Sequence, residues 1–329
     1  MRALVMTAPG GAEHTEIREV EAPSPGPGQV AVDVAYAGLN FVDVMGRRGD
    51  AGYVTAWPYR PGKEVAGTVR AVGEGVTGLA VGDRVVAAPV GGGLAEVVLA
   101  EAALTVPIPD GLALREAAAA PLGLATAVLL LTDAGRLTAG DTVLVHSAGG
   151  GIGHAVAQLV PLIGGGGRLI GTVGRPEKAA AAVASGYHHA FARDEALPEA
   201  VRAATGGRGV DLVLDPLGTE ALELDLELTA PGGRIVLFGN AGGGAVADLP
   251  PLGRLMAGNL TVTGFSHRAL AATAPERLAR AIRTVLDLLA GGDLTLPVTE
   301  VPGLAAVPAA HDAMAEGRAT GKYVVRVAG

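Results

Sequence analysis

The amino-acid sequence predicts an α/β protein built from a doubly wound parallel sheet and a second, β-rich domain. In the first third of the chain, short β-type runs alternate with glycine and proline turns, a pattern typical of a partly open barrel. From about Leu122 to Gly264, strand-like and helix-like segments alternate, which favours a parallel sheet with helices between its strands. The chain has 329 residues, of which 49% are hydrophobic and 18% charged, so we expect an ample core.

Each strand expected in the first third is a short apolar run bounded by turn residues. These runs are Ala3–Met6, Val30–Ala35, Gly67–Val72, Arg84–Ala88 and Ala95–Leu99. The runs expected to form the parallel sheet are Thr142–His146, Arg168–Val173, His189–Phe191, Asp211–Leu214, Arg234–Phe238 and Leu260–Phe265. An amphipathic helix over Glu276–Leu289 and a last strand over Lys322–Val327 return to the first domain. We therefore expect one domain over residues 1–121 and 266–329, and the other over residues 122–265.

The run from Val143 to Val156, VLVHSAGGGIGHAV, has the parts of a dinucleotide-binding turn. An apolar strand meets a glycine cluster, and an apolar helical pattern follows. Glycines let the backbone approach a pyrophosphate, and the helix N-terminus offers free N–H groups and the positive end of a dipole. Alanine replaces the first glycine of the G-x-G-x-x-G pattern. The residues predicted to bind a cofactor here are Ala148, Gly149, Gly150, Gly151, Ile152 and Gly153.

The next predicted strand indicates which dinucleotide is bound. An NAD-binding fold places an acid about twenty residues after the glycine turn, where it binds the ribose 2′-hydroxyl. Here Gly174 leaves space at the strand end, and Arg175 and Lys178 add positive charge. Basic residues at a helix start are unfavourable unless an anion is present. We therefore predict NADPH, with Glu177 left open as a partner of the helix dipole or a ribose ligand.

Charge and composition exclude several classes of function. The formal net charge of −8 argues against nucleic acid or an anionic membrane as the main partner. The chain has no cysteine, which excludes disulfides, thiolate zinc sites and cysteine nucleophiles. Its most apolar stretch, Ala117–Leu131, is interrupted by Pro121 and Gly123 and falls short of the roughly 20 residues of a membrane-spanning helix. We expect a cytoplasmic protein without a secretory signal.

Segments spread over nearly the whole chain resemble the zinc-free quinone oxidoreductase (zeta-crystallin-like) branch of the medium-chain dehydrogenase/reductase superfamily. They are AGLNFVDV from Ala37, PGKEVAG from Pro61, VGDRV from Val81, GGRGVD from Gly206, PGGR from Pro231, and Gly321-Lys322. The resemblance implies a GroES-like catalytic domain, a Rossmann domain and a cleft between them. It also implies NADPH-dependent reduction of a quinone or an activated double bond, by a homodimer joined near Leu260–Phe265.

The resemblance separates this chain from the zinc alcohol dehydrogenases of the same superfamily. The positions of their catalytic zinc ligands align with Asn40, Lys63 and Leu122. An amide, a protonated lysine and an alkyl group cannot form the open tetrahedral zinc site. We therefore expect no metal, because hydride transfer to an electron-poor carbon does not require the Lewis acid that zinc supplies.

The predicted catalytic residues are Asn40, Tyr53 and Lys63, which are candidate donors to the oxygen of the reduced acceptor. Asn40 matches the family's Asn-Phe-x-Asp motif, which in relatives lies beside the nicotinamide. The alternative for Asn40 is a turn residue with side-chain to backbone hydrogen bonds. Tyr53 follows a loop near the substrate mouth of relatives. Lys63 is open to three roles: it donates a proton, anchors an acidic substrate or pairs with Glu64. Asp43 is expected to be structural.

Further cofactor contacts follow from the resemblance and from strand ends. Thr126 matches a threonine near the nicotinamide, and Arg193 stands where related NADPH enzymes bind the 2′-phosphate. Three residues lie at the end of a predicted strand, at the edge where open α/β sheets bind ligands: Phe238, the last residue of the strand, and Gly239 and Asn240, which follow it. His146, within the strand before the glycine turn, is expected to be a buried, hydrogen-bonded histidine.

Three functions stay open at this point. The first is an NADPH-dependent reductase of a small electrophilic molecule, a quinone or an enone. The second is an enoyl thioester reductase of a polyketide or fatty-acid type pathway, because Val143–Ala148 and Asp43–Met45 are similar to enoylreductase domains of polyketide synthases. The third is a non-catalytic NADPH-binding protein with a structural or regulatory role.

Overall fold

The computed structural model describes residues 1–163, 167–243, 245, 248 and 250–327, and the chain divides into two compact units. Unit 1 comprises Met1–Thr126 and His267–Gly329, and unit 2 comprises Ala127–Ser266. The first division falls within helix α3 (Ala125–Leu129). The structural divisions thus lie at residues 126/127 and 266/267, where the sequence predicts boundaries at 121/122 and 265/266.

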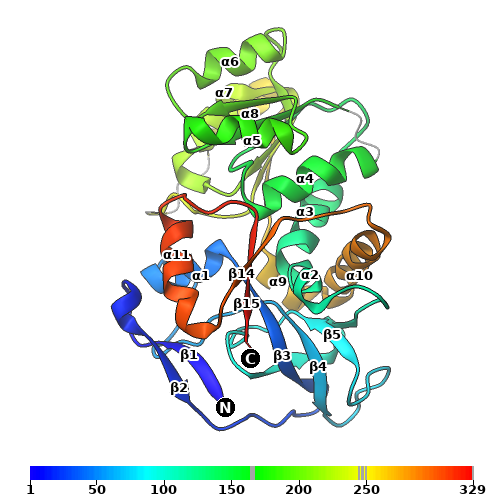
Figure 1. The fold of residues 1–329 in the computed structure, drawn as a ribbon. Coiled ribbons are helices and arrows are strands. Elements are labelled where there is room, and N and C mark those ends of the chain that lie inside the picture. The colour runs from blue at the N-terminus through cyan, green and yellow to red at the C-terminus, as the bar shows by residue number, and fades with distance from the viewer. Residues whose placement is uncertain (164–166, 244, 246–247, 249, 328–329) are drawn as a thin grey trace. The chain divides into compact units, whose positions relative to one another are not determined.

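Unit 1 is built around a seven-stranded sheet, with a separate two-stranded ribbon (Figure 1). Its strands are β1 (Arg2–Met6), β2 (Thr15–Glu19), β3 (Gln29–Leu39), β4 (Val65–Val72), β5 (Arg84–Ala87), β6 (Val97–Glu101), β7 (Thr105–Pro107), β14 (Val298–Val301) and β15 (Lys322–Arg326). The large sheet has the order β14-β15-β3-β4-β5-β7, and β6 pairs with β3. Only the pair β14–β15 is parallel among these neighbours.

Helices return the last part of the chain to this sheet. The helices of unit 1 are α1 (Phe41–Arg48), α2 (Leu114–Ala117), α9 (His267–Thr273), α10 (Pro275–Gly291) and α11 (Val307–Ala315). Helix α10 confirms the predicted amphipathic helix: Leu278, Ile282 and Val285 are fully buried on one face. It begins at a proline and is followed by Gly292, whose φ of 78° is the left-handed conformation that stops helices.

Unit 2 is a six-stranded parallel sheet. Its strands are β8 (Val143–Val145), β9 (Leu169–Val173), β10 (His189–Ala192), β11 (Val210–Asp215), β12 (Thr229–Leu237) and β13 (Thr261–Gly264). Their order is β10-β9-β8-β11-β12-β13, and every neighbouring pair is parallel. The order reverses between β8 and β11, which is the switch point where doubly wound sheets bind ligands.

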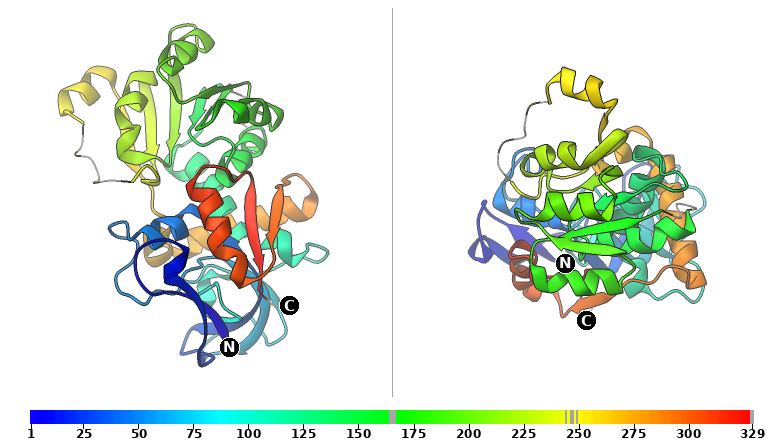
Figure 2. Two further views of the ribbon diagram at one scale, coloured as in Figure 1. Left: turned by 60° about the vertical axis from the view of Figure 1, so that its left-hand side comes forward. Right: turned by 90° about the horizontal axis from the view of Figure 1, so that it is seen from above.

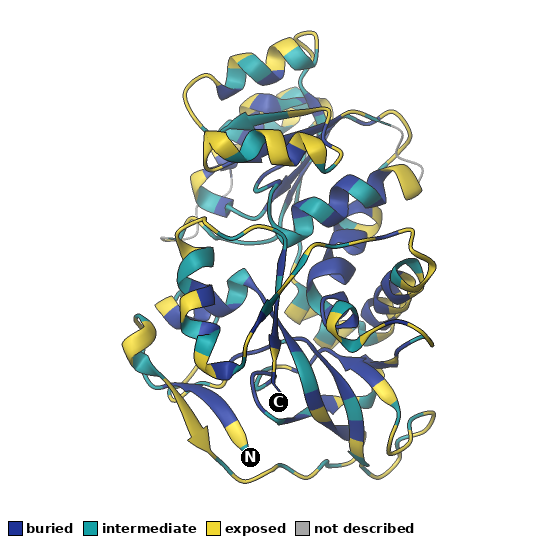
Figure 3. Ribbon diagram, in the orientation of Figure 1, coloured by how far each residue is buried: buried dark blue, intermediate teal, exposed yellow. Residues whose placement is uncertain are grey.

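Helices cover both faces of this sheet (Figure 2). They are α4 (Gly151–Leu162), α5 (Ala179–Ala184), α6 (Leu197–Ala204), α7 (Leu222–Leu228) and α8 (Leu252–Gly258). Right-handed crossovers place α4 and α5 on one face and the later helices on the other, because the direction of strand addition reverses at β8. All residues of β8 and β9 are buried, as continuous apolar runs in a covered parallel sheet should be; Figure 3 shows these strands as buried and the outer helix faces as exposed.

Most strands predicted from the sequence are confirmed, with two informative shifts. Strand β6 begins at Val97, two residues after the predicted start, because Ala95 instead forms an isolated bridge with Ala3 of β1. Strand β12 begins at Thr229, five residues before the predicted start at Arg234, and includes Pro231–Gly233, beside a register shift between Val210 and Leu212 of β11. Within the described ranges, no helix has both the length and the apolar character needed to cross a bilayer.

Candidate active site

The turn between β8 and α4 has the close backbone packing that the glycine pattern predicts. Ser147 has a left-handed backbone, with φ of 58°, and the Ala148 N–H donates to the Thr172 carbonyl oxygen over 2.9 Å. A Cβ on Gly153 would overlap the Ala148 carbonyl group, so this position of α4 requires glycine. A Cβ on Gly149 would meet nothing within 4 Å. The backbone just before the N-terminus of α4 is therefore open to an approaching ligand.

Alanine at the first position of the glycine pattern is accommodated by a glycine on the neighbouring strand. Ala148 is fully buried, and a Cβ on Gly171 of β9 would lie 2.6 Å from the Ala148 methyl group. Gly171 therefore leaves the space that the methyl group of Ala148 fills. The departure from the strict G-x-G-x-x-G pattern thus leaves the turn intact.

The guanidinium of Arg193, just after β10, lies beside the end of β9. A Cβ on Gly174 would lie 3.0 Å from Arg193 Nη2, and the Arg193 backbone N–H donates to the Val173 carbonyl oxygen over 3.0 Å. Arg193 Nη1 is buried, and none of the described residues accepts a hydrogen bond from it. Desolvation lowers the pKa of Arg193, against the charges of Glu220 and Asp215, which raise it. Because a buried donor without an acceptor is costly, this corner fits a ligand anion.

Two more basic residues lie at the same strand end. Arg175 Nη1 is 4.0 Å from Glu177 Oε1 on the surface. The pKa of Lys178 is lowered by desolvation and by the charge of Arg175, while Glu177 raises it. The structure thus brings Arg175 and Lys178 to the end of β9 that Arg193 also reaches. A group of three cations fits the 2′-phosphate of NADPH, which is doubly charged at neutral pH.

The loop after β12 holds the three residues predicted there at the carboxyl edge of the sheet. The Phe238 N–H donates to the Asp215 carbonyl oxygen over 2.9 Å. Asn240 Oδ1 accepts from the Thr219 N–H over 3.2 Å, and Asn240 Nδ2 donates to the Gly243 carbonyl oxygen over 3.3 Å. The Asn240 side chain therefore ties its own loop to the turn after β11, and its contact with a cofactor stays a prediction.

A fully buried polar network connects the end of β8 with α7. His146 Nδ1 is 2.7 Å from Thr172 Oγ1, and His146 Nε2 is 2.7 Å from Asp225 Oδ1. This confirms His146 as a buried, hydrogen-bonded histidine. Asp215 at the end of β11 accepts from two backbone N–H groups of the turn that follows it. One side-chain nitrogen of His146 and one carboxylate oxygen each of Asp215 and Asp225 lie within 4.8 Å of one another. The sequence did not indicate this cluster.

Burial sets the protonation of this network. Desolvation lowers the pKa of His146 to about 4, so the imidazole is neutral. Desolvation and then the charge of Asp225 raise the pKa of Asp215 to about 7, and desolvation raises the pKa of Asp225 to about 7. Two carboxyl groups in one buried site hold a proton between them because both cannot ionise together. Asp225 Oδ2, which accepts no hydrogen bond from the described residues, is free to carry it.

We expect Asp225→Asn to weaken a pH dependence of stability, because Asp215 then loses the neighbouring charge that adds to the effect of desolvation. In the unfolded chain both carboxyl groups ionise near pH 4, whereas the folded pair keeps its proton up to about pH 7. The folded state binds more protons in this window, so this contribution to stability is lost as the pH rises through 7. Relative to the variant, the wild type should lose up to about 1 kcal/mol more between pH 6 and pH 8, measured by urea unfolding.

The control for this prediction is Asp33→Asn on β3. Asp33 is an exposed carboxylate that pairs with Arg70 over 2.9 Å, so its removal should shift stability by the same small amount at both pH values. A constant difference between the wild type and Asp225→Asn would mean that the buried acids share no proton.

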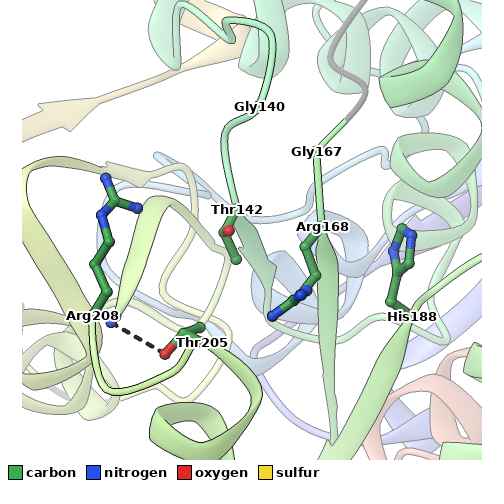
Figure 4. A pocket seen from close by; sticks show the side chains of 8 residues that line it. Gly140, Thr142, Gly167, Arg168, His188, Thr205 and Arg208 are labelled. Carbon is green, nitrogen blue, oxygen red and sulfur yellow. Dashed lines mark hydrogen bonds between the residues drawn. The ribbon is translucent and has the colours of Figure 1, made fainter.

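A hollow of about 450 Å³ lies at the opposite edge of the sheet in unit 2 (Figure 4). Thr142, Arg168 and His188 directly precede strands at the amino edge, whereas doubly wound sheets bind ligands at the carboxyl edge. Arg168 donates to the carbonyl oxygen at the end of α6, and Arg208 binds Asp211 with two bonds of 3.0 and 2.5 Å. Its arginines thus serve the unit itself, and this hollow is not the predicted cofactor site.

Unit 1 holds a second buried constellation around Asn40. Lys322 Nζ at the start of β15 donates to Asn40 Oδ1 over 2.7 Å, to the Leu39 carbonyl oxygen over 2.9 Å, and to Glu64 Oε1. Asn40 Nδ2 donates to Glu64 Oε1 over 2.8 Å. Glu64 Oε2 accepts from the Leu122 N–H over 2.8 Å and from the next N–H over 3.3 Å. The Asn40 amide is therefore held at both ends by an ion pair with side chains only 6% and 0% exposed.

The residues at the aligned zinc positions do not fit a zinc ion. Asn40 turns its oxygen to Lys322, Lys63 carries an ammonium group, and Leu122 has no donor atom in its side chain. The Lys322 ammonium occupies the place beside Asn40 and Glu64 where a cation would be bound, and it uses all three of its donors there. The donor set therefore replaces a metal cation with a lysine, and no step of the reaction is assigned to zinc.

The other two predicted catalytic residues lie on loops of unit 1. Lys63 Nζ donates to the Val90 carbonyl oxygen over 2.8 Å, so the proposed pairing of Lys63 with Glu64 is wrong, because Glu64 binds Lys322. Burial lowers the pKa of Lys63. Tyr53 is half-buried, and desolvation raises the pKa of its hydroxyl. Their catalytic roles stay predictions.

Asp43 has the structural role predicted for it. It is fully buried, its Oδ2 accepts from the Asn40 N–H over 3.0 Å, and its Oδ1 accepts from the Gly62 N–H over 3.1 Å. Desolvation raises the pKa of Asp43, against the two backbone hydrogen bonds, which lower it. Asp43 thus ties the start of α1 to the loop before β4.

Thr126, predicted near the nicotinamide, is a buried residue with an unused hydroxyl group. Its exposed fraction is 4%, and its Oγ1 finds no hydrogen-bond partner in the part of the chain that the structure describes. A buried hydroxyl without a partner is costly unless a ligand supplies one. This hydroxyl supports the contact with the nicotinamide, which stays a prediction.

Sequence reasoning missed the Glu64–Lys322 pair and Asp225, although each has a signal in its periodicity. Lys322 has the same strand phase as Val324, which is fully buried, so the lysine lies on the inward side of β15. Asp225 lies three residues after Leu222 and next to Leu226, on the buried face of α7. A charged residue whose position in the periodicity is buried requires a partner. Applied to the sequence, this rule would have marked Lys322 and Asp225 as buried charges with partners elsewhere in the chain.

Two family models match the chain. Residues 26–110 match the alcohol dehydrogenase GroES-like domain, and residues 151–287 match the zinc-binding dehydrogenase family. A quinone oxidoreductase from Pseudomonas aeruginosa is 36% identical over 98% of this chain and 99% of its own length. A mycocerosic acid synthase-like polyketide synthase from Mycolicibacterium smegmatis is 34% identical over 98% of this chain, which spans only 15% of that protein.

A solved structure extends this similarity to the fold. The crystal structure of Escherichia coli quinone oxidoreductase complexed with NADPH matches with a TM-score of 0.90 and 30% identity. The match covers 99% of this chain and 100% of the other. The predicted fold class, a GroES-like β-rich domain with a Rossmann sheet, is confirmed.

Proposed function

The chain belongs to the zinc-free quinone oxidoreductase branch of the medium-chain dehydrogenase/reductase superfamily, and from this premise we propose that it reduces a quinone or an activated double bond with NADPH and without a metal. The protein is an oxidoreductase. The observation that carries the cofactor assignment is Arg193, whose buried Nη1 has no partner among the described residues and whose guanidinium lies beside Gly174. An NADH site would have a carboxylate at this strand end.

Bound NADPH supplies the hydride, so the protein contributes binding, orientation and polarity. In unit 2, the open backbone at Gly149 and the N-terminus of α4 bind the pyrophosphate. Arg193, Arg175 and Lys178 neutralise the 2′-phosphate, and an arginine fork does so with two parallel hydrogen bonds. These residues would hold the adenosine end of the cofactor.

In unit 1, the proposed site centres on Asn40. The Asn40 amide donates to Glu64 and accepts from Lys322. Asn40 therefore has a positioning role in the site and does not transfer a proton. Lys63 is the proposed donor to the reduced acceptor, because its lowered pKa brings its acidity closer to neutral pH, where general acids work best. Tyr53, whose pKa is raised, is the weaker proton donor and serves as a hydrogen-bond donor.

An enoyl thioester is the second candidate acceptor. The similarity to a segment of a polyketide synthase favours it, and the same residues would act, because the enolate formed from a thioester also needs a donor at its oxygen. The two candidates differ in the acceptor and share the cofactor and the direction of hydride transfer.

The direct test is NADPH oxidation by chelator-treated protein, with a quinone and a short enoyl thioester offered in parallel. We expect NADPH consumption that does not change with chelator, and slower reaction with NADH. Preference for the thioester would favour the second acceptor class. Faster reaction with NADH would contradict the assignment of Arg193, and tight NADPH binding without any turnover would contradict both acceptors.

We also propose a homodimer joined through the outer strand of unit 2. Among the described strands, β13 has a neighbour on one side only, and an unpaired edge invites a second strand. On α8, Leu252 and Met256 are 70% and 69% exposed and lie four residues apart on one face. A monomeric mass by analytical ultracentrifugation would contradict this assembly.

A cytoplasmic location, which the lack of cysteine fits, is testable by cell fractionation.

A further inference from the structure

Among the described residues, two cations in unit 1, Lys63 and Arg268, have only carbonyl oxygens as hydrogen-bond partners. Lys63 Nζ donates to the Val90 carbonyl oxygen over 2.8 Å, and Arg268 Nη1 donates to the Gly52 carbonyl oxygen over 3.3 Å. Among the residues that the structure describes, neither cation forms an ion pair with a carboxylate. Most other arginines of the chain do form such pairs, so this arrangement leaves two positive charges uncompensated.

Both cations flank the buried constellation of Asn40. Lys63 directly precedes Glu64, whose carboxylate accepts from the backbone at Leu122. Arg268 directly follows His267, whose Nε2 is 3.0 Å from the Pro121 carbonyl oxygen, next to the same backbone. The charge of Arg268 lowers the pKa of Lys63, in addition to the larger effect of burial. The segments that carry the two cations therefore meet the same backbone at Pro121 and Leu122, and their charges act on each other.

The hydroxyl group of Tyr59 is also affected by the charge of Arg268. Burial raises the pKa of the Tyr59 hydroxyl, the charge of Asp43 raises it further, and the charge of Arg268 lowers it. The same two charges affect the pKa of Lys63, which Asp43 raises and Arg268 lowers. Arg268 is exposed, while Lys63 and Tyr59 are partly exposed, so a ligand can reach all three.

The nearby acids do not neutralise these cations. Glu64 is already paired with Lys322. Asp43 is fully buried, both of its oxygens accept backbone hydrogen bonds, and burial raises its pKa. The groups that face Lys63 and Arg268 thus leave a net positive region, which attracts an anion.

We propose that Lys63 and Arg268 form a binding site for an anionic group of the acceptor, so that the enzyme prefers electron-poor double bonds in molecules that carry a carboxylate or a phosphate. This inference rests on the proposed function and narrows its substrate class. Arginine binds either anion through a planar fork, and lysine adds a point charge. The anion is a carboxylate of a small acceptor or the phosphate of a carrier arm, and both present the same chemistry to these residues.

The test uses pairs of acceptors that share a reacting bond and differ in charge. One pair is 4-oxopent-2-enoate and its methyl ester; the other is crotonyl-4′-phosphopantetheine and crotonyl-pantetheine. We expect kcat/KM of wild-type protein to be about tenfold higher for the anion in at least one pair. Arg268→Gln should lower this ratio toward one, through KM more than kcat. Lys63→Gln should also lower the ratio, and its kcat should fall for both members of a pair because Lys63 is the proposed proton donor. The pair that shows the preference identifies the source of the anion.

Arg18→Gln is the charge-matched control. Arg18 is an exposed residue of β2 that binds Glu16 over 2.6 Å, and its loss should leave the ratio unchanged. A wild-type ratio near one in both pairs, or a ratio that neither site variant lowers, would overturn the proposal.

A binding measurement separates this proposal from the proposed function. If no acceptor is reduced, the reductase assignment fails, and calorimetry with 4-oxopentanoate and its methyl ester still decides the anion site. Tighter binding of the acid that is lost in Arg268→Gln supports the site. Equal binding of acid and ester, or binding unaffected by both variants, refutes it.

Discussion

Replacing Lys322 by methionine will lower the free energy of unfolding of unit 1 by about 3–5 kcal/mol, the usual cost of removing one partner of a buried ion pair. The Glu64 side chain is fully buried and its Oε1 is bound by Lys322 and by Asn40 Nδ2. Methionine has a similar length and no charge, so it leaves the carboxylate without its counter-ion in a region that water cannot reach. Chemical denaturation followed by a probe in unit 1, such as Trp57 fluorescence, measures the loss.

A second replacement distinguishes the ion pair from a general packing defect. Glu64→Gln in the Lys322→Met background removes the stranded charge, so the double variant should recover a large part of the lost stability. Arg326→Gln on the same strand is the matched control, because Arg326 is 53% exposed and pairs with Glu300 over 2.6 Å. Its cost should stay below about 1 kcal/mol. A double variant as unstable as Lys322→Met would show that the charge is not the cause.

The fold was predictable because its signals are local. Strands such as β8 and β9 are continuous apolar runs, and a strand buried on both faces of a parallel sheet must be such a run. The glycine turn also occupies one short stretch of chain, so its backbone requirements at Gly153 are written in neighbouring residues. The limits of some strands depend on a distant partner, as for β6 and the bridge from Ala95 to Ala3. In such cases the strand was predicted, but its bounds were displaced by a few residues.

The site was less predictable because its polar pairs join distant parts of the chain. Lys322 lies 258 residues from Glu64, and Asp225 lies 79 residues from His146. No periodicity reports which two buried charges meet, although each one alone reveals that a partner is needed. Lys63 illustrates the consequence: its neighbour in sequence, Glu64, was an obvious partner, and a lysine from the last strand holds that place instead.

Replacing Gly174 by aspartate will reverse the preference for NADPH over NADH. A Cβ at this position lies 3.0 Å from Arg193 Nη2, which is the end of a flexible side chain, so an aspartate fits after a small shift. Its carboxylate will bind the Arg193 guanidinium and repel the 2′-phosphate. Losing charge-assisted hydrogen bonds and adding repulsion should lower kcat/KM for NADPH by about 100-fold or more. The same carboxylate can accept from a ribose 2′-hydroxyl, so the value for NADH should hold or rise.

The matched control is Gly174→Asn, which has the same size as aspartate and no charge. If charge governs the choice of cofactor, the asparagine variant keeps most of the preference for NADPH, and Arg193→Gln loses it without improving NADH. Steady-state kcat/KM with both nucleotides and one quinone gives the three ratios. Equal losses in Gly174→Asp and Gly174→Asn would mean that Gly174 provides only space. A Gly174→Asp protein that still prefers NADPH would show that the 2′-phosphate binds away from Arg193. The buried Nη1 of Arg193, which has no partner among the described residues, would then not be explained by this ligand.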